Sequence, residues 1–195
     1  MGGYFAGLLG GLAAVGREVA GSDRFEVVTP VHTRSAQEWA GALGWFVGLC
    51  PVEFAVGSDC SFGDLATRAA ESIASVKPAA AVPFDRIGEH LETPIRPRFV
   101  VSYMDVRFVP EAAQWPEWNA RALRSKAYTH DVYIWINRTP PQGLNLAVRY
   151  PGNETANAAV HAYVAALRRT IEEIVTEPDA AASDSYSSVV FETVS

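Results

Sequence analysis

The stretch Leu43-Gly-Trp-Phe-Val-Gly-Leu-Cys-Pro-Val-Glu-Phe54 is apolar almost throughout, and glycines stand two residues before and after Phe46. Glycines ahead of an apolar run indicate a tight turn that leads into a buried strand, which we expect over residues 50–56. Cys50 is the only strong nucleophile here, and a lone thiol in such a run usually acts as a small buried hydrophobic side chain. The stretch therefore predicts structure and offers no chemistry of its own.

Apolar periodicity on either side predicts the other elements. Helices are expected over about 4–20, 61–77 and 155–175, with a shorter helical turn over 82–91. Strands are expected over 25–30, 50–56, 98–107, 132–136 and 144–150, the last two as a hairpin, and a long loop with two Trp over 110–130. This order predicts an α/β fold in which helices flank a mixed β-sheet.

Two helices carry informative local signals. The 4–20 segment contains Gly7, Gly10, Gly11 and Gly16, so it is a poor helix former that tertiary packing must hold. Because the chain begins inside this segment, we expect it to be part of something longer. Ser61 and Asp64 have the spacing of a capping box at the start of the second helix.

Composition limits the possible classes of protein. The chain has 195 residues, which is the size of one domain, and a net charge of −6, which argues against a nucleic-acid or anionic-membrane partner. Two cysteines are too few for a disulfide framework and fit a reducing cytoplasm. Residues 3–16 are apolar but end at Arg17, too short for a transmembrane segment. We assign residues 1–176 to one domain and residues 177–195 to a polar tail, whose 177–188 segment should be mobile.

Candidate chemistry is sparse. Among four histidines, His130 has an acidic neighbour, Asp131, but neighbours on a strand point to opposite faces. An α/β enzyme that uses this pair stays open as an alternative. No His or Cys pair has metal-ligand spacing, so we expect no metal. A phosphate-binding Gly-rich loop and a Gly-x-Ser-x-Gly motif are both absent.

Five short segments in order resemble the C-terminal lobe of condensation-domain acyltransferases, over about residues 4–175. Within this superfamily, related in fold to chloramphenicol acetyltransferase, the closest resemblance is to the polyketide-synthase-associated acyltransferases of actinobacterial lipid synthesis. The segments are Val28-Thr-Pro-Val-His-Thr-Arg34, Leu43-Gly-Trp-Phe-Val-Gly48, Pro51-Val-Glu-Phe54, the 61–77 helix followed by Val82-Pro-Phe-Asp85, and Arg98-Phe-Val-Val-Ser-Tyr103.

The resemblance implies one lobe of a two-lobed acyltransferase that moves a fatty or polyketide acyl group from a thioester to a hydroxyl. The acceptor would be a lipid or glycolipid, and the thioester would be acyl-CoA or an acyl carrier phosphopantetheine, with no other cofactor. The family's catalytic signature, His-His-x-x-x-Asp-Gly, lies in the N-terminal lobe. No His in this chain has an acid four residues later, so the signature is missing and no catalytic residue is expected here.

Site residues follow from the same resemblance. Arg34 matches the Arg that pairs with the signature's Asp and joins the lobes; without that lobe it should find water or another acid. Gly44, Trp45, Phe46, Val47 and Gly48 match the turn that forms a wall of the substrate channel. Gly48 stands where the family usually has Asn, which puts a polar role there in doubt.

Two hypotheses remain for the function. The first is a truncated or split acyltransferase lobe, inactive alone, whose partner is the missing N-terminal lobe and possibly an acyl carrier protein or polyketide synthase. The second is a non-catalytic lobe that binds an acyl carrier, a lipid or a partner protein through its exposed channel wall.

Overall fold

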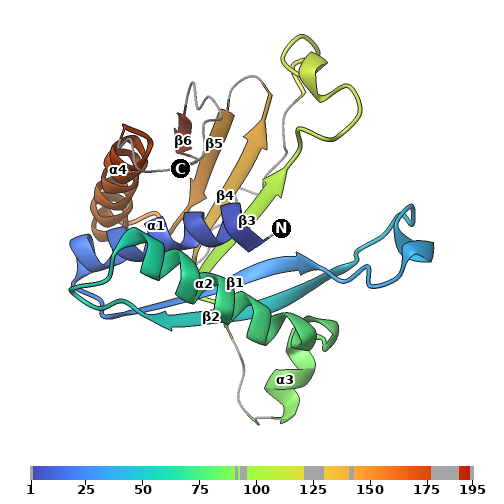
Figure 1. The fold of residues 1–195 in the computed structure, drawn as a ribbon, viewed down its shortest axis with the longest axis horizontal. Coiled ribbons are helices and arrows are strands. Elements are labelled where there is room, and N and C mark those ends of the chain that lie inside the picture. Colours follow the sequence, from blue (N-terminus) through green and yellow to red (C-terminus); the bar gives the residue numbers. More distant parts are fainter. Residues whose placement is uncertain are drawn as a thin grey trace. The chain divides into compact units, whose positions relative to one another are not determined.

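The computed structural model of the chain describes residues 2–90, 92, 96–120, 130–140, 143–176 and 189–193. The chain divides into two compact units, Met1–Phe99 and Val100–Ser195 (Figure 1). Among the helices of these described residues, none is long and apolar enough to cross a membrane.

The first unit contains helices around one antiparallel pair of strands. Its elements are α1 (Gly2–Ala20), β1 (Arg24–His32), the 3-10 turn η1 (Gln37–Trp39), β2 (Val47–Ala55), α2 (Phe62–Val76), the 3-10 turn η2 (Lys77–Ala81) and α3 (Phe84–His90). β1 pairs with β2 in register from Arg24 opposite Ala55 to His32 opposite Val47. Figure 1 shows η1 in the loop at the far end of this strand pair. The predicted turn and strand at 43–54 are therefore confirmed, and the strand begins earlier, at Val47.

The core of this unit explains how a glycine-rich helix is held. Leu9, Leu12 and Val15 of α1 are fully buried. A Cβ atom at Gly10 would lie 2.9 Å from the backbone nitrogen of Ala66 in α2. The glycine therefore lets the two helices approach closely, so packing compensates for the low helix propensity of α1.

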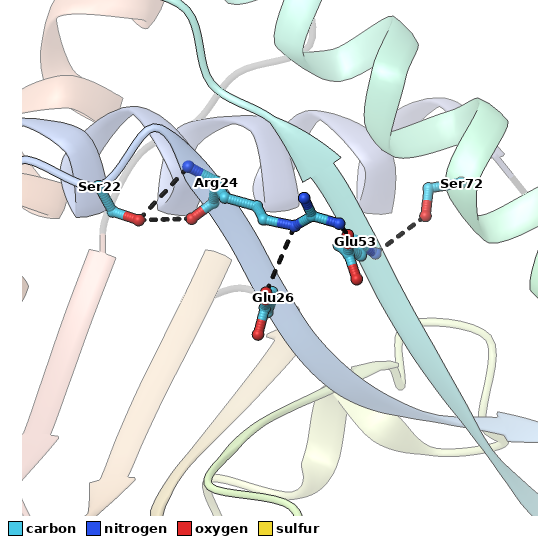
Figure 2. Close-up of polar contacts among 5 residues, drawn as sticks. All are labelled: Ser22, Arg24, Glu26, Glu53 and Ser72. Atoms are coloured by element: carbon cyan, nitrogen blue, oxygen red, sulfur yellow. Dashed lines mark hydrogen bonds and ion pairs between the residues drawn. The ribbon is translucent and has the colours of Figure 1, made fainter.

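Glu53 of β2 contacts Arg24 of β1 and Ser72 of α2 (Figure 2). The backbone N–H of Glu53 donates to Ser72 Oγ at 3.0 Å. The Glu53 carboxylate forms an ion pair with Arg24 Nη2, and Arg24 Nε lies 3.4 Å from Glu26 Oε1. β2 is an edge strand, and contacts of this kind hinder pairing with a further strand.

The predicted capping box at the start of α2 is confirmed. Ser61 Oγ accepts from the Asp64 backbone N–H at 3.2 Å, and Asp64 Oδ2 accepts from the Ser61 backbone N–H at 2.9 Å. The Ser61 hydroxyl also donates to Asp64 Oδ2 at 2.7 Å. These hydrogen bonds from Ser61 hold the pKa of Asp64 below its ordinary value, because they stabilise the carboxylate.

The second unit is built on a mixed sheet. Its elements are β3 (Phe99–Asp105), the 3-10 turn η3 (Ala112–Gln114), β4 (Val132–Thr139), β5 (Gly143–Arg149), α4 (Glu154–Thr176) and β6 (Val189–Thr193). The strands lie in the order β3-β4-β5-β6. β4 and β5 are antiparallel, as the hairpin prediction required, whereas β5 and β6 are parallel. The predicted α/β class with a mixed sheet and helices is confirmed.

β6 differs from the sequence-based expectation. Residues 177–195 were assigned to a polar tail, yet Val189–Thr193 pairs with β5 from Leu144 opposite Val189 to Val148 opposite Thr193. The segment reads Val-Val-Phe-Glu-Thr, and β-branched and aromatic residues favour strands. These five residues therefore belong to the sheet. Residues 177–188 lie outside the described residues, so their expected mobility stays a prediction.

Candidate functional site

Arg34 lies two residues after β1 and holds the following loop in place. Its Nη2 donates to the backbone oxygen of Ala42 at 3.0 Å. Its guanidinium carbon lies 4.7 Å from the centre of the Phe46 ring, and the Thr33 backbone N–H donates to the Phe46 oxygen at 2.9 Å. A cation over an aromatic face is attractive, so one side chain joins the two ends of the loop.

The described partners of Arg34 are a backbone carbonyl and an aromatic ring, while the expectation of water around it stays a prediction. The Phe46 ring also lies 6.2 Å from the Trp39 ring, centre to centre. No described carboxylate forms an ion pair with Arg34. Its Nε is buried and has no hydrogen-bond partner in the described part of the chain. One charged donor therefore stays unused beside a guanidinium whose position is fixed.

The five residues expected to form a channel wall have different environments. Trp45 is 88% exposed, and the preceding Leu43 is 100% exposed. Gly44 has a φ of +150°, which suits glycine, while Phe46 is half-buried beneath Arg34. Val47 is half-buried at the start of β2. The turn thus presents a large apolar surface from Leu43 and Trp45 and keeps Phe46 for packing.

Gly48 has a steric reason to be glycine. A Cβ atom at this position would lie 1.9 Å from the backbone oxygen of Ala80 in η2, inside any allowed contact distance. The residue is buried in β2. An Asn at this position would collide with η2 in this structure, so the departure from the family's motif is matched by the packing around it. Nothing in the sequence near Ala80 indicates this contact.

The described titratable groups form no catalytic constellation like that of a hydrolase. All four histidines are exposed; His130 precedes β4, and His161 Nε2 lies 3.5 Å from the Tyr150 hydroxyl. Cys50 is buried with its sulfur 3.8 Å from the Val76 oxygen, and burial raises the pKa of its thiol. No group of three or more His, Cys, Asp or Glu residues that could hold a metal occurs among the residues described.

Comparison with known proteins identifies the family. A model of the condensation domain matches residues 9–189, which is most of the chain. The chain belongs to the condensation-domain family. The resemblance stated from the sequence is thereby confirmed.

This condensation-domain chain is similar to characterised acyltransferases. It is 34% identical over 173 residues to trehalose-2-sulfate acyltransferase PapA2 of Mycobacterium tuberculosis, covering 85% of this chain and 36% of that protein. It is 29% identical over 178 residues to acyltransferase PapA3 of the same species, covering 88% and 37%. The solved structure of PapA2 acyl transferase superposes with a TM-score of 0.73 at 30% identity, covering 87% of this chain and 38% of that one.

The chain spans just over a third of the length of these relatives. The X-domain from teicoplanin biosynthesis superposes with a TM-score of 0.67 at 16% identity, which shows a shared fold alone. The comparisons therefore establish the family and the fold. The roles expected for Arg34 and for residues 44–48 stay predictions.

Proposed function

We propose that this condensation-domain chain is the C-terminal lobe of an acyltransferase. The enzyme would move a fatty or polyketide acyl group from a thioester to a hydroxyl of a lipid or glycolipid acceptor. Support comes from the relatives, among them PapA2 and a 2'-acyl-2-O-sulfo-trehalose (hydroxy)phthioceranyltransferase, PapA1, which is 26% identical over 171 residues. The 34% identity to PapA2 is the main support for the proposal, because the sequence comparison and the structure comparison both match that protein.

The chemistry requires a base that this chain does not supply. In acyl transfer to a hydroxyl, a base removes the hydroxyl proton while the acceptor oxygen forms a bond to the thioester carbonyl carbon. The carbon–sulfur bond then breaks, and the departing thiolate takes up the proton and leaves as the free thiol. None of the four exposed histidines belongs to a His-His-x-x-x-Asp-Gly signature. The proposed base is the signature's second His on an N-terminal lobe, in the same polypeptide or in a second chain. Without that lobe, the chain is inactive.

Arg34 is proposed to join the two lobes. Its guanidinium is fixed by Ala42 and Phe46, and its Nε is a buried donor without a partner in the described residues. The Asp of the His-His-x-x-x-Asp-Gly signature would supply the missing acceptor. Charge-assisted hydrogen bonds between Arg and a carboxylate are strong and directional, so they suit a contact that aligns two lobes.

Residues 44–48 are proposed to form one wall of the acyl channel. Exposed Trp45 offers apolar surface to an acyl chain, while Gly44 lets the backbone turn closely around it. The acyl group would arrive on CoA or on the phosphopantetheine of an acyl carrier protein or polyketide synthase. We place the reaction in the cytoplasm, where free thiols such as Cys50 and Cys60 persist.

Titration of the full chain with a separately expressed N-terminal lobe of PapA2 tests this assignment. Calorimetry should show saturable association, which Arg34→Ala weakens and Arg86→Ala leaves unchanged. Arg86 is a matched control because it is exposed and pairs with Glu89 within α3. An affinity that is unchanged by Arg34→Ala would contradict the proposed pairing. Absence of association with any family N-terminal lobe would contradict the lobe assignment.

The second candidate is a non-catalytic lobe that binds an acyl carrier, a lipid or a partner protein. The full exposure of Leu43 and near-full exposure of Trp45 favour it, because apolar side chains in such positions commonly mark a binding surface. Under this alternative, the chain binds an acylated carrier protein by itself, and Leu43→Ser with Trp45→Ser abolishes that binding. No acyl transfer would appear when a His-bearing lobe is added.

A further inference from the structure

Arg149, the last residue of β5, lies over two aromatic rings of β4. It is the cross-strand partner of Tyr133. Its guanidinium carbon is 5.7 Å from the centre of the Tyr133 ring and 5.5 Å from that of the Trp135 ring. The two rings stack with centres 4.2 Å apart and planes inclined by 21°. One guanidinium therefore lies within cation–π distance of both rings of a stacked pair.

The N–H donors of Arg149 have no hydrogen-bond acceptor among the described residues. It makes no hydrogen bond or ion pair with any residue that the structure describes, and its Nε is buried without a partner. A cation–π contact supplies no hydrogen-bond acceptor, so it leaves the N–H donors of the guanidinium without a partner. A guanidinium stays charged at any ordinary pH, so it cannot escape desolvation by losing a proton. The arrangement therefore calls for an anionic acceptor.

The surroundings of Arg149 are ordered before any ligand arrives. Ser102 of β3 hydrogen-bonds to the Tyr133 hydroxyl. Alternation places Tyr133 and Trp135 on one face of β4, while Ile134 and Ile136 of the other face are buried in the core. The strand and Ser102 thus fix the two rings, and contact with these rings restricts the Arg149 side chain before a ligand binds. A pre-ordered donor loses less entropy on binding.

We propose that Arg149, resting on Tyr133 and Trp135, forms a binding site for the oxyanion of a small molecule, namely a carboxylate, sulfate or phosphate group. Two oxygens of a carboxylate, sulfate or phosphate group match the paired N–H donors of an Arg side chain, and the neighbouring rings shield part of the guanidinium from water. The site is independent of the acyl-transfer proposal, because it uses no residue assigned a role there. An anionic group on an acceptor or donor molecule would be recognised by this chemistry.

Titration with simple anions tests the site in the full chain. Sodium sulfate, phosphate and acetate are added in turn at constant ionic strength, with chloride as the balancing anion. The readout is the indole N–H resonance of Trp135, assigned with Trp135→Phe. At least one anion should give a saturable shift. If all three anions shift the resonance only slightly and linearly, as chloride does, the effect is that of an adventitious ion only. That result would overturn the proposal.

Variants separate a specific site from general charge effects. Arg149→Met should abolish the saturable shift, and Arg149→Lys should weaken binding about tenfold, because an ammonium keeps the charge without the planar fork. Arg168→Ala is the control, since Arg168 is exposed and pairs with Glu172 on α4; its binding should equal that of the native chain. Should Arg149→Met fail to fold by circular dichroism, Arg149→Lys decides. Undiminished binding in Arg149→Lys would overturn the assignment, as would binding in Arg168→Ala that is weakened as much as in Arg149→Lys.

Discussion

The guanidinium of Arg34 lies 4.7 Å from the centre of the Phe46 ring and joins the two ends of the loop between β1 and β2. The backbone contact from Thr33 to Phe46 closes the same loop. Arg34 therefore has a structural role within this chain before any other lobe is considered. The proposed pairing with an Asp would add to a contact that already exists.

Replacement of Arg34 by Ala should destabilise the chain by ~1–2 kcal/mol. The substitution removes a cation–π contact and a hydrogen bond to the Ala42 oxygen, each of which contributes modestly at a half-buried position. Urea unfolding followed by circular dichroism measures the change. Phe46→Leu should lose only the first contribution, so its effect should be smaller. A free energy of unfolding unchanged by Arg34→Ala would show that the loop is not held in this way.

Introduction of a single methyl group at Gly48 should be costly. The new Cβ would meet the Ala80 oxygen at 1.9 Å, and both are backbone-attached atoms that cannot rotate away. Overpacking of this kind typically costs ~1–3 kcal/mol, and we expect the upper part of that range. Gly41→Ala is the control, because no atom lies within 4 Å of a Cβ there. Equal melting temperatures for the two variants would refute the close approach of β2 and η2.

A substitution at Thr29 should stabilise the chain, in contrast to the two destabilising substitutions above. It is fully buried in β1, and its hydroxyl has no partner among the described residues. Thr29→Val keeps the shape of the side chain and removes the unpaired hydroxyl, so it should stabilise the chain by ~1–2 kcal/mol. Thr29→Ser retains the hydroxyl but loses a methyl group, so it should destabilise. Denaturant unfolding of both variants decides, and a less stable Thr29→Val would indicate a partner for the hydroxyl.

Local signals account for what the sequence predicts well. Ser61 and Asp64 make their capping box because the interaction needs only four consecutive residues. The hairpin of β4 and β5 follows from alternation and a turn, which are also local. In contrast, the contact between Gly48 and Ala80 spans thirty-two positions, and no pattern within either segment encodes it. β6 was missed because five residues beyond a polar stretch gain a strand conformation only by pairing with β5.

The candidate sites also depend on contacts between residues that are distant in sequence. Arg34 could be singled out only through resemblance to a family, because a lone Arg in a loop carries no spacing signal. Its contact with Phe46 depends on the fold of the loop between them. Arg149 was missed altogether, although Tyr133 and Trp135 alternate on a predicted strand. Their meeting depends on the register of the hairpin, which places Tyr133 opposite Arg149.

The capping box should make helix α2 sensitive to acid. Hydrogen bonds from Ser61 lower the pKa of Asp64 below its ordinary value of 3.8 in the folded chain. The carboxylate therefore contributes stability that is present above pH 3.8 and is lost as the pH falls through the lower, folded-state pKa. Circular dichroism of unfolding at several pH values should show this loss. Asp64→Asn should flatten the profile in that window, and an unchanged profile would contradict the linkage.

We propose that this chain supplies the C-terminal lobe of an acyltransferase whose catalytic His lies on another lobe. Radiolabelled palmitoyl-CoA and trehalose-2-sulfate are incubated with the full chain alone, with a His-bearing N-terminal lobe of PapA2 alone, and with both. The acylated sugar is measured by chromatography. Product is expected only when both lobes are present, and none is expected when the second His of the signature is replaced by Ala. Acylated product from this chain alone would contradict the lobe assignment, as would product that survives the His substitution.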